Sequence, residues 1–244
     1  MMRVALISDV HANLAALEAV LRDADAERTE AVWNLGDVVG YGADPDRVIE
    51  LMVIEGVRCV MGNHDAAVAG LIGTETFNAM ASKAIAWTTL HTTPQSREYL
   101  AGLPRVEKDG FYTRLHGTLR EPLWEYLSTF DAARAHFEAQ ETPYSVVGHT
   151  HLPLVVREVR PGRVEAVTPT PGAVVELGEE RLCINPGSTG QPRDGDPRAS
   201  YAVLDTDAGT VAYHRVAYDI EASQKRMRDV GLPDALAGRL AIGR

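Results

Sequence analysis

Apolar and polar residues in the first quarter of the chain alternate in blocks that predict a β-α-β-α-β arrangement. Short apolar runs at residues 4–7, 31–35 and 57–61 have the length of buried strands. Asn13 is placed to cap a helix whose apolar residues between 14 and 21 share one face, and Asp44-Pro45 opens a second helix that ends near Gly56. Strands that alternate with helices in this way predict an α/β sheet.

The middle of the chain, from residue 66 to about 142, is dominated by helical patterns. Phe77, Met80, Ala84 and Trp87 recur at helical spacing, residues 123–127 and 132–139 continue the pattern, and a short strand is expected at 110–115. We interpret this stretch as a helical, cap-like insertion. Its methionine and aromatic stripe is typical of core packing rather than of a cofactor site.

Strand patterns dominate after residue 151. Six short β-rich segments are expected at residues 152–159, 164–167, 173–177, 181–184, 201–205 and 211–216, and residues 205–209 have the composition of a hairpin loop. The helix-alternating first part and the strand-rich last part together predict two sheets packed face to face, with helices outside. We expect a single α/β domain that covers residues 1–244.

Length, charge and cysteine content narrow the class of protein. A chain of 244 residues with 45% hydrophobic residues is long enough for one large domain. No apolar run approaches the length that spans a bilayer and the chain starts directly with a strand, so we expect a cytoplasmic protein. The net charge of −10 argues against nucleic-acid binding. Cys59 and Cys183 lie inside apolar segments, which predicts buried free thiols.

Residue types that bind metals directly follow four of the apolar runs. The blocks are Asp9-Val10-His11, Gly36-Asp37, Gly62-Asn63-His64-Asp65 and Gly148-His149-Thr150-His151. In an open α/β sheet, ligands bind beyond the carboxyl ends of the strands. Asp9 and His11 flank one residue, so both would point the same way from an extended segment, and the last block repeats this spacing. We therefore predict one site for divalent metals, built from carboxylates, imidazoles and an amide.

These blocks resemble the motifs of the calcineurin-like metallophosphoesterases, which are D-x-H, G-D, G-N-H-[DE], a lone downstream His and G-H-[TS]-H. His116, at the end of the strand expected at 110–115, is the best match to the lone histidine. The resemblance implies a four-layer α/β/β/α sandwich with two packed mixed β-sheets. It also implies a centre of two divalent metal ions, for which we expect manganese, with iron, zinc, nickel or cobalt as alternatives.

The roles of single residues follow from the same resemblance. One metal would be held by Asp9, His11, Asp37 and His151, and the other by Asp37, Asn63, His116 and His149, so that Asp37 bridges the two. His64 matches the family's proton-handling histidine, while Asp65 either orients an imidazole or caps the segment that follows. The other histidines lack a second ligand-type residue at metal spacing and are not expected in the site: His91, His136 and His214.

Such a centre has a chemistry that general principles describe. Two cations about 3.5–4 Å apart clamp the attacking and leaving oxygens of an in-line displacement and acidify a bridging water. Asp9 and Asp37 offset only two of the four positive charges, so the pocket is locally cationic although the chain is acidic. We therefore expect a phosphoester as the substrate.

A polar loop at residues 185–198 is a second candidate for contact with the substrate. It begins with Asn-Pro-Gly-Ser, and a similar loop follows G-H-T-H in bacterial members of the family that the chain resembles. We expect Asn185, Ser188 and Arg193 to face the pocket. Either Arg193 or Arg198 would contact a substrate phosphate, the alternative being a salt bridge to a neighbouring aspartate.

One departure from the family pattern bears on the substrate. Protein phosphatases and symmetrically cleaving diadenosine tetraphosphatases carry an arginine that helps to hold the substrate phosphate, and Tyr41 stands at that place here. We therefore expect a phosphodiesterase that acts on a small or nucleotide-derived substrate, with His64 protonating or stabilising the leaving oxygen.

Other functions remain open at this point. A phosphomonoesterase, a protein phosphatase or a diadenosine polyphosphate hydrolase is the enzymatic alternative, and a noncatalytic scaffold of the same fold is the rival from another class. The chain keeps His64, which a scaffold relative lacks, and this favours the enzyme. Substrate choice would fall to residues 66–142, and the sequence is compatible with a homo-oligomer.

Overall fold

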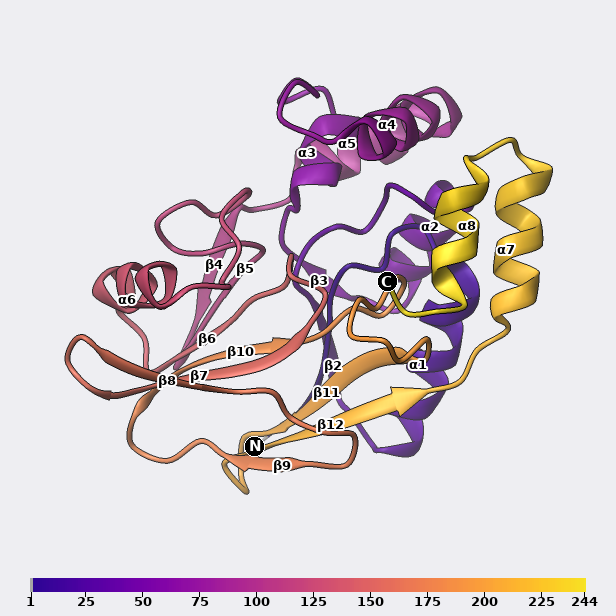
Figure 1. Cartoon of the computed structure of the whole chain (residues 1–244). Helices are drawn as coiled ribbons and strands as arrows, with labels where there is room; N and C mark the ends of the chain where they lie inside the picture. Colours follow the sequence, from indigo (N-terminus) through magenta and orange to yellow (C-terminus); the bar gives the residue numbers. More distant parts are fainter. Residues whose placement is uncertain (1) are drawn as a thin grey trace.

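Two six-stranded mixed sheets form the centre of residues 2–244, the part of the chain that this computed structural model describes (Figure 1). From edge to edge, the first sheet contains β3 (Arg58–Cys59), β2 (Ala31–Asn34), β1 (Arg3–Ile7), β11 (Ala199–Asp205), β12 (Thr210–Val216) and β9 (Val174–Glu176). The second contains β4 (Val106–Asp109), β5 (Tyr112–Leu115), β6 (Tyr144–Val146), β10 (Arg181–Pro186), β7 (Pro153–Arg160) and β8 (Arg163–Val167). Strands β1, β2 and β3 are parallel, whereas β11 is antiparallel to β1.

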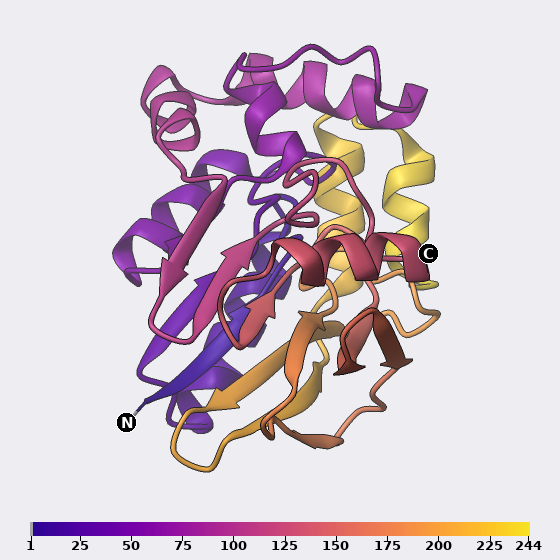
Figure 2. The same cartoon turned by 90° about the vertical axis from the view of Figure 1, so that its left-hand side faces the viewer.

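Helices cover the outer faces of both sheets. Helices α1 (Leu14–Ala26) and α2 (Pro45–Ile54) connect the parallel strands and begin where the sequence predicts: the Asn13 side chain accepts a hydrogen bond from the backbone of Ala16, and Pro45 opens α2. Both pack against the first sheet. Helix α6 (Phe130–Ala139) lies across the outer face of the second sheet (Figure 2), where the fully buried Phe137 packs on β5 and β10.

The inner faces of the two sheets pack against each other. Leu6 and Trp33 from the first sheet meet Tyr112, Val155 and Ile184 from the second. Burying each of these side chains stabilises the fold by about 1.5–3 kcal/mol relative to leaving it in water. The four-layer α/β/β/α sandwich of two packed mixed sheets is therefore confirmed. The cysteine prediction is confirmed too, because Cys59 and Cys183 are both buried free thiols.

The stretch from residue 66 to 142 is less helical than its sequence pattern predicts. Helix α3 (Asn63–Val68) leads into α4 (Ala79–His91) and α5 (Pro94–Ala101), but β4 and β5 then join the second sheet. Residues 123–127 form a loop, not a helix. Leu123 and Leu127 are buried because this loop packs on α3 and α6, so their spacing only imitates a helix face.

Two helices near the end of the chain carry no clear signal in the sequence. Helices α7 (Ile220–Asp229) and α8 (Asp234–Leu240) form a hairpin that packs on α4 and on Tyr41. Helix α7 is amphipathic, but its sequence is mostly polar and only Met227 is buried, so few apolar residues mark its buried face. Among residues 2–244, no helix combines the length and the hydropathy needed to cross a bilayer.

Candidate metal centre

The loops that follow five strands bring the predicted metal ligands together. These loops leave the carboxyl ends of β1, β2, β3, β5 and β6, at one edge of the sandwich. All seven predicted ligands are between 0% and 4% exposed: Asp9, His11, Asp37, Asn63, His116, His149 and His151. Donor atoms of six of them lie close together in two groups, with Asp9, His11 and His151 in one and Asp37, His116 and His149 in the other.

The Asp37 carboxylate lies between the two groups. Its Oδ2 atom is 3.6 Å from His11 Nε2 and 3.4 Å from His116 Nε2. Its Oδ1 atom accepts a hydrogen bond of 2.9 Å from the backbone N–H of His64. One oxygen is thus held by the protein backbone while the other faces a histidine of each group, which is the arrangement that a bridging carboxylate needs.

Backbone carbonyls fix the orientation of the four predicted histidine ligands. The Nδ1 atoms of His11, His116 and His151 each lie 2.6–3.0 Å from a carbonyl oxygen. A carbonyl can only accept, so these nitrogens carry a proton, and in the neutral ring Nε2 keeps its lone pair. His149 is reversed, because its Nε2 lies 3.1 Å from the carbonyl of Trp124 and Nδ1 keeps the lone pair. Such outer hydrogen bonds are typical of histidines that bind metals.

Several buried polar atoms of the site have no hydrogen-bond partner among the described residues. Asp9 uses Oδ2 to accept from the Ser8 hydroxyl at 2.6 Å, whereas its Oδ1 has no partner. Asn63 Oδ1 and His116 Nε2 are likewise buried without a hydrogen-bond partner among the described residues. Leaving a buried polar atom unsatisfied costs about 1–3 kcal/mol, so three together require an explanation. Divalent metals at this point would accept all three lone pairs, and the residues therefore fit a dinuclear centre.

The protonation of the site reflects burial and the mutual fields of its charges. Burial raises the pKa of Asp9 to about 7. Burial also opposes ionisation of Asp37, but neighbouring His116 and His64 outweigh it and hold the pKa of Asp37 well below its usual range. Burial would lower the pKa of His116, yet the Asp37 carboxylate raises it to about 9. The cluster therefore holds protons that a bound cation would displace.

The ligand-bearing loops have an unusual backbone. Asp9, His11, Asp37, His149 and His151 all have φ between 49° and 66°, in the left-handed region that residues other than glycine rarely adopt. The expectation that Asp9 and His11 project from an extended segment is wrong, since both lie past the end of β1. Backbone strain of this kind clusters at functional sites, where the surrounding structure enforces it.

Glycines in the motifs allow the loops to approach each other closely. A Cβ atom on Gly62 would lie 2.1 Å from Asp37 Oδ1, and one on Gly148 would lie 1.9 Å from the Ser8 hydroxyl. Both distances are shorter than any stable contact, so a side chain at either position would displace a carboxylate or its hydrogen-bond partner.

The polar loop after β10 supports the site more than it lines it. Asn185 Nδ2 donates to the carbonyl of Gly148 at 2.7 Å, and the Ser188 hydroxyl donates to the carbonyl of Asp9 at 2.8 Å. Both side chains are fully buried, so neither faces the pocket as we expected. Instead, they hold the backbone of the two loops that carry His149 and Asp9. Asp65 has a comparable role, because it caps α3 by accepting from the Gly62 N–H and also accepts from the Val39 N–H.

The two candidate arginines of this loop have different surroundings. Arg198 is exposed and forms an ion pair of 2.6 Å with Asp196. Arg193 is half-buried and lines the pocket, where it donates to the Gln191 side chain at 2.9 Å and lies over the Tyr41 ring. Its Nε atom has no partner among residues 2–244. Arg193 is therefore the arginine that a substrate phosphate could reach.

A pocket of about 270 Å³ opens onto the candidate metal centre. His64 lines this pocket with its ring centroid 4.5 Å from that of Tyr41 and 5.1 Å from that of Phe77, and burial lowers the pKa of His64 to about 4. The remaining wall includes Phe77, Trp124 and Tyr126. The sequence pattern gave these aromatic residues no role at the site. The sequence pattern predicts that Phe77 lies on a helix face, but α4 begins two residues later, after the Asn78 cap.

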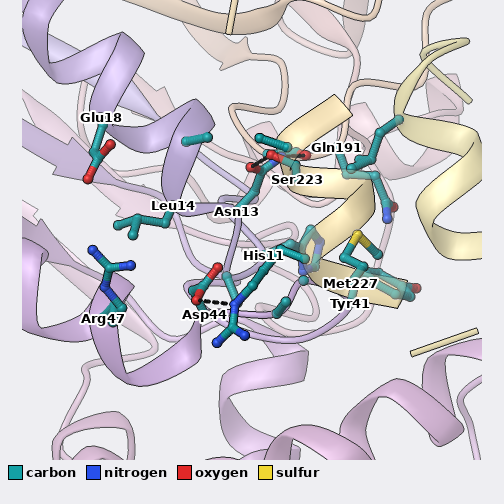
Figure 3. Close-up of a pocket in the computed structure, with 18 residues that line it drawn as sticks. His11, Asn13, Leu14, Glu18, Tyr41, Asp44, Arg47, Gln191, Ser223 and Met227 are labelled. Carbon is teal, nitrogen blue, oxygen red and sulfur yellow. Dashed lines mark hydrogen bonds and ion pairs between the residues drawn. The ribbon is translucent and has the colours of Figure 1, made fainter. Parts of the chain in front are cut away.

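A second cavity of about 250 Å³ shares Tyr41 with this pocket and also borders His11 (Figure 3). Asp44, at its edge, forms an ion pair of 3.1 Å with Arg226 of α7. The other charged residues of the lining, Glu18 and Arg47, also offset each other, and Figure 3 shows both at the end away from His11. The charges of this cavity are thus balanced, which makes the pocket with Arg193 the better place for a phosphate.

His64 also lies close enough to His11 and Asp37 for the three to form a further group of potential ligands. The geometry alone therefore permits two roles for His64, as a ligand or as a group that faces the substrate. Its Nδ1 atom is buried without a hydrogen-bond partner in the described part of the chain.

Comparison with known proteins places this site in a family. The sequence profile of the calcineurin-like phosphoesterase superfamily domain matches residues 2–209. An uncharacterised protein of Methanocaldococcus jannaschii is 34% identical over 246 residues, which cover 99% of this chain and 98% of that protein.

Solved structures agree with the sequence match. A metallophosphoesterase from Sphaerobacter thermophilus is 46% identical, with a TM-score of 0.90 over 100% of this chain and 99% of that one. A hypothetical protein from Pyrococcus horikoshii has the same fold, with a TM-score of 0.81 at 20% identity over 100% and 99% of the two chains. The chain described here belongs to the calcineurin-like phosphoesterase superfamily.

Proposed function

We propose that this chain hydrolyses a phosphodiester bond in a small or nucleotide-derived substrate, with two divalent metal ions as cofactors. The observation that carries the proposal is the position of the Asp37 carboxylate, with one oxygen 3.6 Å from His11 Nε2 and 3.4 Å from His116 Nε2. A carboxylate shared by two groups of nitrogen ligands is suited to a pair of ions, and manganese is the metal we expect.

The ligand sets follow from the two groups around Asp37. Asp9, His11 and His151 would complete one set, and Asn63, His116 and His149 the other. Two divalent ions in these sets supply Lewis-acid stabilisation of the phosphate and acidify a water molecule.

The remaining roles belong to residues that face the pocket. His64 is positioned to donate a hydrogen bond or a proton to the leaving oxygen, because its ring borders the pocket while its backbone N–H holds Asp37. The Arg193 guanidinium is positioned to orient the phosphate, since it lines the same pocket and its Nε is free of hydrogen bonds within residues 2–244.

Charge favours a diester over a monoester. A phosphodiester carries one negative charge, which two divalent ions offset without further help, whereas a monoester dianion needs an additional cationic group. Tyr41 stands where the related phosphatases carry an arginine for that purpose. Arg193 is the specific observation in favour of a second candidate, a phosphomonoesterase, because it brings an arginine to the pocket from a different loop.

A pair of aryl substrates tests the proposal. The chain is treated with a chelator, reloaded with manganese, and assayed for kcat/KM on bis(p-nitrophenyl) phosphate and on p-nitrophenyl phosphate. We expect the diester to be the better substrate and the chelated protein to be inactive. Arg193→Ala is compared with Arg198→Ala, whose guanidinium is paired on the surface.

Each alternative has its own outcome in this assay. A preference for the monoester that Arg193→Ala abolishes and Arg198→Ala preserves would identify a phosphomonoesterase. Absence of hydrolysis with manganese, iron, zinc, nickel and cobalt alike would reject the enzyme in favour of a scaffold.

A further inference from the structure

Besides Tyr41, three aromatic side chains line the substrate pocket beside the predicted metal ligands. The rings of Phe77 and Trp124 meet edge to face with centroids 4.7 Å apart, and Phe77 also contacts the His64 ring at 5.1 Å. Tyr126 stacks on His149 with centroids 4.0 Å apart and ring planes 6° from parallel. Two of the three rings therefore contact residues to which we assign a catalytic or metal-binding role, namely His64 and His149.

Phe77 and Trp124 pack against the hydrophobic clusters on one side and leave part of each ring at the pocket. Phe77 and Trp124 are only half-buried, and Tyr126 is 46% exposed. They come from two separate loops, one between α3 and α4 and the other between β5 and α6, which meet at the pocket. Ligand pockets are typically lined by aromatic surface of this kind, which here remains partly exposed at a concave site where two loops meet.

Polar groups next to the rings are few. Thr76 and Asn78 flank Phe77 in the lining, and Asn78 uses its Oδ1 to cap α4. Among the residues 2–244 that line this pocket, Arg193 is the one with a permanent positive charge. Arg239 interacts electrostatically with Arg193 and Tyr41, but it does not line the pocket.

The size and charge of the pocket limit the ligand. Its volume of about 270 Å³ lies just below the range of about 300–1,000 Å³ for pockets that hold drug-sized ligands. A polyphosphate chain would need several cationic groups beyond the metals, and the lining offers only Arg193 among the described residues. A ligand with one phosphate and one flat ring matches both limits.

We propose that Phe77, Trp124 and Tyr126 form a subsite for a planar aromatic group that is joined to a single phosphate. This inference rests on the proposed function, because it places that phosphate at the metal centre. It names the substrate class as nucleoside or aryl esters with one phosphate, and it excludes dinucleoside polyphosphates and aliphatic phosphodiesters as preferred substrates.

Direct binding measurements test the subsite without relying on turnover. The manganese-loaded protein is titrated in a calorimeter with AMP, with phenyl phosphate and with ribose 5-phosphate, which share a phosphomonoester and differ in the aromatic group. We expect AMP and phenyl phosphate to bind about 5- to 100-fold more tightly than ribose 5-phosphate, the effect expected of one stacked ring. Trp124→Leu and Phe77→Leu should each reduce this ratio strongly, whereas Trp124→Phe should keep most of it.

A matched control removes an aromatic ring elsewhere. Phe111 is 68% exposed and does not line the pocket, so Phe111→Leu should leave the affinity ratio unchanged. Melting temperatures of all variants show whether they are folded. If AMP alone binds tightly, the subsite recognises a nucleobase, and if phenyl phosphate binds equally well, it accepts any flat ring.

The subsite and the proposed function fail in different ways. A ratio near one in the wild type, or a ratio that Trp124→Leu and Phe77→Leu leave unchanged, would overturn the subsite even if bis(p-nitrophenyl) phosphate is hydrolysed. Tighter binding of diadenosine tetraphosphate than of AMP would overturn the single-phosphate class. Absence of phosphodiester hydrolysis together with a large, Trp124-dependent ratio would reject the proposed function and leave the aromatic subsite standing.

Discussion

Replacing His64 with Ala should lower turnover while the metal content of the protein stays the same. Replacing His64 with Ala removes a ring that borders the pocket and that packs against Tyr41, Phe77 and His11. It does not remove the 2.9 Å hydrogen bond to Asp37 Oδ1, because the donor is the backbone N–H of residue 64. The hydrogen bond from the Gly62 N–H to Asp65, which caps α3, also remains.

His64→Ala should affect both the rate of hydrolysis and the stability of the fold. A positioned proton-transfer group contributes about 10²- to 10⁴-fold in rate, which corresponds to about 3–5 kcal/mol in the barrier. Lost packing of the buried ring should lower the free energy of unfolding by about 1–3 kcal/mol. We therefore expect His64→Ala to lose about 10²- to 10⁴-fold in kcat on bis(p-nitrophenyl) phosphate while it retains two metal ions per chain.

The assay combines steady-state kinetics with metal analysis of the purified variant. His91→Ala is the matched control, since His91 is exposed on α4 and stacks on Trp87 away from the pocket. Loss of one metal ion from His64→Ala would show that His64 is a ligand in the group it forms with His11 and Asp37. Full activity in a folded His64→Ala variant would refute any chemical role.

Three further predictions concern the bridge, the loops and the core. Asp37→Asn should weaken both metal sites together, and metal analysis that finds two fully occupied sites would contradict the bridging role. Gly62→Ala should reduce metal affinity at least tenfold because its Cβ would lie 2.1 Å from Asp37 Oδ1, whereas Gly238→Ala, which meets no atom within 4 Å in α8, should leave metal affinity unchanged. Burial lowers the pKa of His136 from 6.5 to about 4, so below pH 6.5 the unfolded chain binds a proton at this residue that the folded chain does not bind, and His136 should contribute a fall of about 3 kcal/mol in the free energy of unfolding as pH drops from 6.5 to 4. Urea denaturation of the wild type and of His136→Gln across this range should show that the variant lacks this component, and parallel pH profiles would contradict it.

Local signals account for most of the fold that the sequence predicts. The cap at Asn13, the proline at the start of α2 and the short apolar runs of the strands depend only on neighbouring residues, and these elements form where expected. The errors occur where burial comes from distant contacts. Leu123 and Leu127 imitate a helix face, although a loop buries them against other helices.

Residue types and spacing indicate which groups gather at the site, but not how they are held. The sequence could not separate Arg193 from Arg198, because the difference lies in an ion pair that only Arg198 forms, with Asp196. Nor could it assign Ser188, which supports Asp9 from 179 residues away along the chain. Such long-range hydrogen bonds have no periodic pattern in the sequence.

The left-handed backbone of the ligand loops shows why those distant contacts matter. Each such residue costs on the order of 1–3 kcal/mol, so the five ligands together carry strain comparable to the 5–15 kcal/mol stability of a typical domain. Hydrogen bonds beyond the strand ends offset it: the N–H of Asp9 donates to Gly36, the N–H of His11 donates to Asp37, and the carbonyl of Asp9 accepts from Gly190. The loops after β1, β2 and β10 thus hold one another in place. Carbonyls of the loops after β2 and β10 also hold the Nδ1 atoms of His11, His116 and His151 and so orient Nε2 toward the centre. The fold itself therefore preorganises the candidate metal centre, and the short sequence motifs show only which residues take part.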